Sequence, residues 1–177
     1  MAMTLITTNT ESGDANSSFT SSIDSTYKLY IFKFIDINPA GDAEYFYMNG
    51  SIDGGSNYNV SKTTTFWESR AAESGGTPAT SYSTGADLAN ATGYQLLTSD
   101  IGSGADESAA GTLWLFNPSS TTYVKHFSAE LNGYASGNST YHTFIAGYFN
   151  TTDNIDAMDF KFGSGNFDGT IKMYGVG

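Results

Sequence analysis

Apolar and polar residues alternate along most of the chain, and a period of two is typical of half-buried β-strands. In residues 58–67, for example, Tyr58 and Val60 lie on one face of the predicted strand and Asn59 lies on the other. Clusters of Gly, Asn, Asp and Ser separate such stretches and mark turns. The predicted strands cover residues 4–8, a short run around Phe19, 27–37, 43–52, 58–67, short runs around Tyr82 and at 94–97, then 111–116, 123–131, 141–149, 155–162 and 169–175.

Residues 27–37 carry large apolar side chains on both faces, which predicts a central strand covered at least in part on both sides. Residues 85–90 leave room for one helical turn, and residues 98–110 form the longest polar loop. We count about ten strands at spacings of about 8–14 residues, which is typical of antiparallel sandwiches and jelly rolls. The sequence therefore predicts an all-β protein, with one antiparallel, jelly-roll-like β-sandwich domain over residues 1–177.

The composition agrees with this fold class. The chain has 177 residues, with 12 Phe, 12 Tyr and 2 Trp, and only 14% of its residues are charged. Soluble domains usually carry ~25% charged residues, and a helical bundle or coiled coil would also need Ala, Leu, Glu and Lys in bulk. The aromatic residues bury enough apolar surface to offset the entropy of the chain, which argues against disorder.

The net charge of −11 at pH 7 limits the classes of partner. Its 7 Lys and Arg residues are dispersed, so we expect the chain to bind neither nucleic acid nor an anionic membrane surface. Without cysteine, disulfides and thiolate metal sites are excluded. Residues 1–6 lack the basic start and the long apolar middle of a signal peptide, so we expect synthesis in a cytoplasm.

Two histidines, His126 and His142, lie on neighbouring predicted strands. A turn centred at Tyr134 would place them opposite each other, with their Cβ atoms about 5 Å apart. One interpretation is a two-histidine metal or acid–base site, and the other is a cross-strand polar pair on an outer or subunit-facing surface. A zinc site needs a third protein ligand, which the spacing does not show. We therefore expect a polar pair, with no metal, no cofactor and no catalytic residue assigned.

Most carboxylates flank predicted turns, which Asp stabilises through its own side chain. Paired acids about 5–10 Å apart in a cleft would instead serve glycoside hydrolysis. Loop oxygens would suit calcium, either around Asp53 or in the loop from Asp100 to Glu107. However, the spacing matches no defined calcium loop, and the Gly-x-Ser-x-Gly and His-Glu-x-x-His motifs of hydrolases and zinc proteases do not occur.

Some aromatic residues are candidates for stacking on sugars, as in β-sandwich lectins and carbohydrate-binding modules. Most rings must nevertheless fill the core or a subunit interface, where Tyr is favoured. For any single ring, the sequence favours this packing role over a sugar-binding one. The sugar-binding candidates are Trp67, Tyr82, Tyr94, Trp114, Tyr134, Tyr141 and Tyr148.

Four segments resemble a family of small virion-associated proteins of marine tailed bacteriophages, including those of cyanobacteria and abundant ocean bacteria. These segments read LITTNTESGDA at 5–15, LWLFNPSSTTYVKHF at 113–127, AGYFNTT at 146–152 and FKFGSGNFDGTIKMYG at 160–175. The resemblance spans nearly the whole chain and is weakest over residues 68–110. Most members of this family are uncharacterised.

The resemblance implies a virion component and brings no enzymatic residues with it. A compact acidic domain suits a decoration or cement protein on the outside of the head, binding the major capsid protein or other virion proteins. We expect a homo-oligomer, for example a trimer. Two alternatives stay open: a receptor- or glycan-binding module of a tail or head fibre, and, more remotely, a polysaccharide depolymerase. The candidate assembly contacts are Leu5, Ile6, Asp106, Glu107, Asn117 and Pro118.

Overall fold

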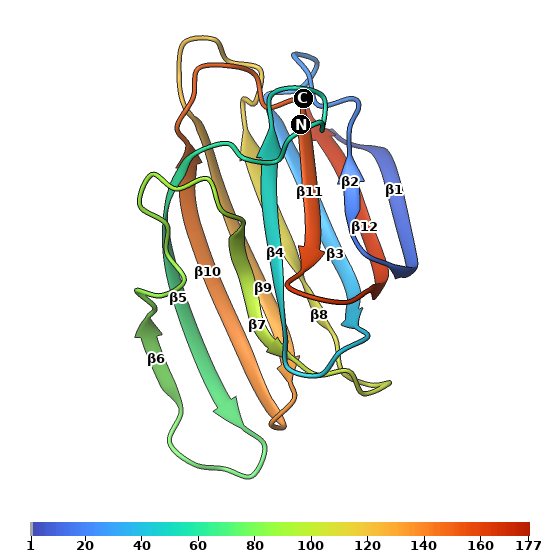
Figure 1. Ribbon diagram of the computed structural model, residues 1–177, viewed down its shortest axis with the longest axis vertical. Helices are drawn as coiled ribbons and strands as arrows, with labels where there is room; N and C mark the ends of the chain where they lie inside the picture. Colours follow the sequence, from blue (N-terminus) through green and yellow to red (C-terminus); the bar gives the residue numbers. More distant parts are fainter. Residues whose placement is uncertain (1) are drawn as a thin grey trace.

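The computed structural model describes residues 2–177, and its regular elements in that range are all β-strands (Figure 1). Each pair of hydrogen-bonded neighbours among these strands is antiparallel. The strands are β1 (Met3–Asp14), β2 (Ser17–Phe19), β3 (Leu29–Pro39), β4 (Glu44–Ser51), β5 (Lys62–Ala72), β6 (Ala79–Tyr82), β7 (Gln95–Ile101), β8 (Ala109–Phe116), β9 (Lys125–Ala135), β10 (Ser139–Phe149), β11 (Ala157–Phe162) and β12 (Phe167–Val176).

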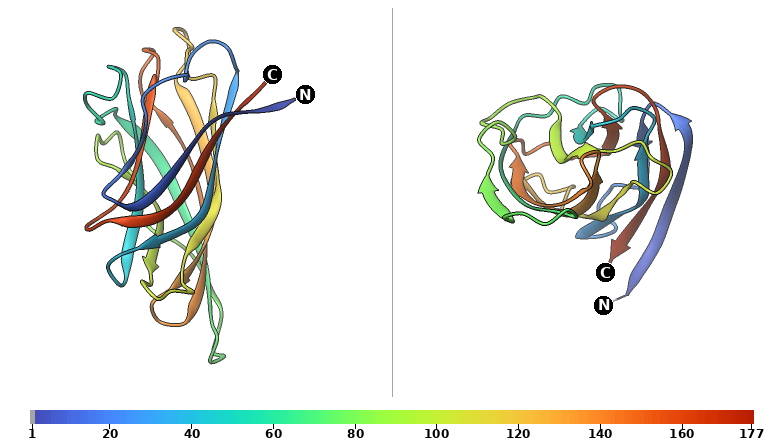
Figure 2. Two further views of the ribbon diagram at one scale, coloured as in Figure 1. Left: turned by 90° about the vertical axis from the view of Figure 1, so that its right-hand side faces the viewer. Right: turned by 90° about the horizontal axis from the view of Figure 1, so that it is seen from below.

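The strands form one sheet that curls back on itself, so that two walls face each other across the interior (Figure 2). The large wall has the order β1-β12-β3-β8-β9-β10-β5-β6, and the small wall has the order β7-β4-β11-β2. One backbone pair, Ile101 opposite Ala135, joins β7 to β9 and links the two walls. At the other side, the side-chain amide of Asn9 in β1 donates hydrogen bonds to the Ser17 hydroxyl and to the Ser18 carbonyl in β2. The sheet is therefore nearly closed.

Alternation along each strand of the large wall sends one set of side chains inward and the other outward. The inward set is almost wholly apolar and fully or nearly fully buried, as in the row that crosses the middle of the wall. Burial of this row against the small wall contributes to the hydrophobic stabilisation of the fold. The row consists of Phe66, Ile145, Ala129, Leu113, Phe32 and Met173 on adjacent strands.

Phe160 of the small wall lies at the centre of an aromatic cluster. Its ring centroid is 5.2 Å from that of Phe32 and 5.1 Å from that of Phe34, both on the large wall. The rings of Phe19 and Phe46 lie at 6.1 and 6.4 Å. Three of these ring pairs are tilted or edge-to-face and the pair with Phe46 is stacked, and such pairs add stabilisation beyond the burial of area. This cluster holds the two walls together.

The prediction of an all-β fold is confirmed, but twelve strands replace the expected ten or so in the described chain. Residues 58–61 are not a strand, because the Tyr58 carbonyl accepts a hydrogen bond from the Asn49 side chain at 2.6 Å. In contrast, β1 continues to Asp14 because β12 pairs with it along its whole length. Residues 85–90 form turns and bends without the helical turn that the sequence allowed.

Candidate binding surfaces

β1 is an edge of the large wall, where it pairs with β12 on one side only. Met3 and Leu5 are 54% and 51% exposed, whereas Ile6 is half-buried and packs against the core. A register shift between Leu5 and Thr7 produces this difference, because the extra residue turns the Ile6 side chain inward. Of the two predicted contacts in this strand, Leu5 is therefore available to a partner and Ile6 is largely not.

The polar loop between β7 and β8 holds Asp106 and Glu107 at the end of the molecule where β3 finishes (Figure 1). Asp106 is exposed, but Glu107 is half-buried and shapes its own loop. Its carboxylate accepts a hydrogen bond from the Gly104 amide at 2.6 Å, and its carbonyl accepts one from the Asn38 side chain at 2.5 Å. Glu107 therefore has a structural role in its loop. Of these two predicted contacts, Asp106 is the one that is exposed to solvent.

Asn117 and Pro118 follow β8 at the opposite end of the wall, next to the residue that precedes β3. The Asn117 amide donates to the Lys28 carbonyl at 2.6 Å, and the Asn117 side chain accepts from the Lys28 ammonium at 3.3 Å. Pro118 is buried, and its carbonyl accepts a hydrogen bond from the Ile155 amide at 3.0 Å. The six predicted assembly residues thus do not form one surface. Pro118 is buried and is not available for contact with a partner.

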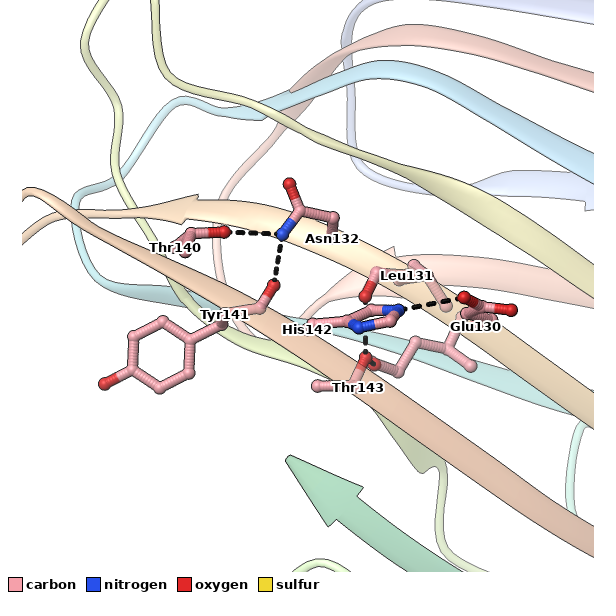
Figure 3. Close-up of polar contacts among 8 residues, drawn as sticks. Glu130, Leu131, Asn132, Thr140, Tyr141, His142 and Thr143 are labelled. Atoms are coloured by element: carbon pink, nitrogen blue, oxygen red, sulfur yellow. Dashed lines mark hydrogen bonds and ion pairs between the residues drawn. The ribbon is translucent and has the colours of Figure 1, made fainter. Parts of the chain in front are cut away.

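The predicted pairing of His126 with His142 is wrong. The hairpin of β9 and β10 turns at Gly137 and not at Tyr134, so His142 lies opposite Asn132 and His126 lies opposite Tyr148. The polar character that was predicted for His142 is nevertheless present. Its Nε2 atom lies 3.0 Å from Oε1 of Glu130, which is two residue pairs further along the hairpin (Figure 3).

The outward face of the large wall carries an aromatic groove, which we define by the residues Thr65, Trp67, Trp114, Ser128, Glu130, Phe144 and Ala146. Trp67 of β5 lies directly opposite Phe144 of β10, and the two side chains are 49% and 45% exposed. Trp114 of β8 stands on the other side of the groove, opposite Ser128 of β9. The groove has a volume of about 270 Å³.

Small side chains make the floor of this groove. Thr65, Ala146 and Ser128 are neighbours in one row across β5, β10 and β9, and the next residue in this row is Trp114 of β8. Trp67 is supported from behind by Tyr82 of β6, whose ring meets it edge-on at 5.3 Å. A second hollow, of about 440 Å³, continues past Trp114 and Glu130 toward Asn132 and Lys33.

The carboxylates were candidates for paired catalytic acids and for metal ligands. Glu130 is the single acidic residue of the aromatic groove, whereas glycoside hydrolysis uses two carboxyl groups. Within residues 2–177, no group of three or more His, Cys, Asp or Glu is placed to hold a metal ion. Asp53, a predicted calcium ligand, instead accepts hydrogen bonds from Asn57 and Ser51, and these lower its pKa to about 2.

A further hollow of about 420 Å³ lies on the small wall around Tyr94, Asp159 and Lys161. The buried Asp159 carboxylate accepts hydrogen bonds from Asn16, Ser18 and Tyr94, and burial raises the pKa of the Tyr94 hydroxyl. The Lys161 ammonium lies 4.3 Å from the centroid of the Tyr94 ring. Asn16, Ser18 and Tyr94 thus satisfy the Asp159 carboxylate, whereas the buried Tyr58 hydroxyl, which also lines this hollow, has no hydrogen-bond partner in the described residues.

Of the predicted sugar-stacking residues, the structure brings Trp67, Tyr82 and Trp114 to one face and places Tyr94 on the small wall. Sequence reasoning missed Glu130 and Phe144. Their position on the outward face follows from strand alternation once the register of β9 and β10 is known. Comparisons with protein-family models, with curated proteins and with solved structures give no match to this chain. In the described residues, no helix is long and apolar enough to cross a membrane.

Proposed function

We propose that this chain is a non-enzymatic surface protein of a tailed-phage virion, acting as a decoration or cement protein on the outside of the head. The virion setting rests on the sequence resemblance. A role in attachment is supported by one structural observation: residues 3–8 of β1 form an open edge with two exposed apolar side chains, Met3 and Leu5.

An open edge strand presents unpaired backbone N–H and C=O groups to a strand of another chain. Natural edges are usually protected by charged residues or proline. Residues 3–8 contain neither, and beyond them Asn9 connects β1 to β2. We expect this stretch to pair with a neighbouring copy or with the capsid protein, and Leu5 to be covered there.

The proposal includes a jelly-roll-like winding of the two walls. Strand pairings are nested: β3 pairs with β12, β4 with β11 and β5 with β10. Nested antiparallel pairs arise when one long ribbon of two strands is wound around a common core, which is the jelly-roll arrangement. In this interpretation β8 and β9 lie between the β3–β12 and β5–β10 pairs of the large wall.

The role is thermodynamic. A protein that binds only the assembled shell stabilises it by about 2.7 kcal/mol per site when its free concentration is a hundred times Kd. Virions that lack the protein should lose resistance to heat and to low salt. Unchanged resistance would contradict a cementing role.

The variant Leu5→Lys tests the surface. It places a charge on the open edge, and we expect fewer copies per virion and, for the purified protein, a shift to monomer in sedimentation analysis. Ile52→Lys is the matched control, because Ile52 is also exposed but lies in the turn after β4. Equal copy numbers for both variants and the wild type would exclude attachment through β1.

A second candidate function is a receptor- or glycan-binding module on a tail or head fibre. The aromatic groove favours it, because exposed Trp67 and Phe144 have no core role. Saturable adsorption of the purified protein to host cells would support this function, and a copy number of a few dozen per virion would place it on the tail.

A further inference from the structure

Aromatic rings border the groove on two sides, and hydrogen-bonding groups lie between them. We propose that the aromatic groove binds a neutral oligosaccharide, with sugar rings stacked on Trp67 and Trp114 and their hydroxyl groups bound by β9. This inference names the ligand class for the second candidate function and does not require assembly through β1.

The spacing of the two tryptophans suits a chain of sugars. Trp67 is on β5 and Trp114 on β8, so β10 and β9 lie between them. Three strand spacings separate the two backbones by roughly 14 Å, which exceeds one pyranose ring. The floor between the two tryptophans consists of small side chains, Ala146 and Ser128, and leaves room for a ligand there. An oligosaccharide therefore fits better than a single sugar.

Polar groups of the groove and of the adjoining hollow lie in a line along β9. Ser128 and Glu130 of the groove and Asn132 of the hollow are at alternate positions and project from the same face of the sheet. Within residues 2–177, no protein hydrogen bond uses the Ser128 hydroxyl, Oε2 of Glu130 or Oδ1 of Asn132.

Neighbouring residues hold two of these groups in place. His142 orients the Glu130 carboxylate, and the Asn132 amide donates to Thr140 and to the Tyr141 carbonyl (Figure 3). The line thus offers fixed acceptors and a hydroxyl. A sugar meets this arrangement with C–H groups on its ring faces and hydroxyls around its rim.

Charge selects the class of sugar. Glu130 is the single ionisable residue of the aromatic groove, and Lys33 in the adjoining hollow donates its hydrogen bond to the Thr112 hydroxyl at 2.7 Å. Because the chain also carries −11 overall, a uronic acid or a sulfated sugar in the groove would be repelled. The same repulsion disfavours a second copy of this chain as the occupant. A second copy would also need a protruding ridge to fill the groove. That ridge would have to be polar, because the hydrogen-bond acceptors of the groove would otherwise be buried without partners.

The experiment is calorimetric titration of the full chain with cellohexaose, laminarihexaose and mannohexaose, and with an oligoguluronate as the acidic probe. We expect saturable binding of at least one neutral hexasaccharide and none of the oligoguluronate. Trp67→Ala and Trp114→Ala should each weaken this binding about two- to tenfold, the range that corresponds to losing one aromatic stacking contact. Tyr123→Ala is the matched control, because Tyr123 is exposed but outside the groove, and it should bind like the wild type.

Two further variants protect the test against misfolding. Ala146→Leu fills the floor of the groove, keeps both tryptophans and should abolish binding with an unchanged melting temperature. Glu130→Gln keeps an acceptor, so it should retain binding of the neutral sugar and weaken the exclusion of oligoguluronate.

Three results would overturn the inference: no binding of any neutral hexasaccharide at millimolar concentration, binding of oligoguluronate alone, or a dimer that dissociates in Trp67→Ala. None of them bears on attachment through β1, because Leu5 is unaltered in every variant.

Discussion

Lys62 provides a sharp test of the electrostatics of the core. Its side chain is fully buried at the start of β5, opposite Phe149. The ammonium donates a hydrogen bond to the Gly93 carbonyl at 2.6 Å and lies 5.8 Å from the centroid of the Phe149 ring, and within residues 2–177 it forms no ion pair with a carboxylate. Burial therefore lowers the pKa of Lys62 from 10.5 to about 8. A charged lysine at this site should lower the free energy of unfolding, and replacement of Lys62 by Met should raise it.

The size of the effect follows from this change in pKa. Each pKa unit corresponds to 1.36 kcal/mol, so a fall from 10.5 to about 8 destabilises the folded chain by about 3 kcal/mol at pH 7. Lys62→Met removes this cost but also the hydrogen bond to Gly93, worth about 1 kcal/mol. We expect the variant to be about 2 kcal/mol more stable at pH 7.

The pH dependence has a definite sign. Between pH 8 and pH 10.5 the unfolded chain still holds the Lys62 proton and the folded chain has released it. The stability of the wild type therefore rises with pH in this interval relative to that of Lys62→Met. Tyrosine ionisation affects both proteins alike and cancels in the difference.

The assay is urea unfolding followed by tryptophan fluorescence at pH 7 and at pH 9.5. The advantage of Lys62→Met should shrink as the pH rises. A difference that is zero at pH 7, or the same at both pH values, would refute the reasoning. Lys125→Met is the matched control, because Lys125 is equally buried but donates to two carbonyls, of Tyr123 and Thr151, and should gain less.

Two further predictions concern the turn at Asp53 and the aromatic cluster. The hydrogen bonds from Asn57 hold the pKa of Asp53 at about 2, so they stabilise the fold above pH 3.8 and lose this effect as the pH falls toward 2. Asp53→Ala should therefore melt below the wild type at pH 7, and a gap that persists at pH 2 would contradict this. Phe160→Ala should cost about 3–5 kcal/mol in urea unfolding, because it leaves a cavity among four rings. A loss below about 1 kcal/mol would show that the walls collapse around it.

The alternation of side chains was sufficient to predict an all-β chain and most strand positions, because the local pattern of polarity indicates which face of a strand is buried. Alternation does not determine the register between two paired strands. The turn of the β9–β10 hairpin lies at Gly137, three residues from the predicted Tyr134, and this shift separates His126 from His142. It also brings Glu130 beside His142. Register depends on turn geometry, which the sequence pattern left open.

The groove was predictable only in part. Trp67 and Trp114 could be named from the sequence, yet they are 47 positions apart and meet on one face because β10 and β9 lie between their strands. Such an arrangement depends on strand order, which is a long-range property of the fold. The predicted assembly residues show that exposure also depends on long-range packing. Pro118 lies in a polar turn but is buried, because its turn packs against the segment at Ile155.

The two proposed surfaces are compatible because of the order of strands in the large wall. β1 is the edge of that wall, and β12 and β3 lie between it and β8, which carries Trp114. Roughly 14 Å of sheet therefore separates the open edge from the nearest wall of the groove. Pairing through β1 adds a strand at the edge of the sheet and covers Leu5. It leaves the outward face of the large wall exposed. A copy attached by its edge would still present the aromatic groove to solvent, so a particle decorated with this chain would display one groove per copy, and weak binding of each sugar chain would add up to strong adhesion.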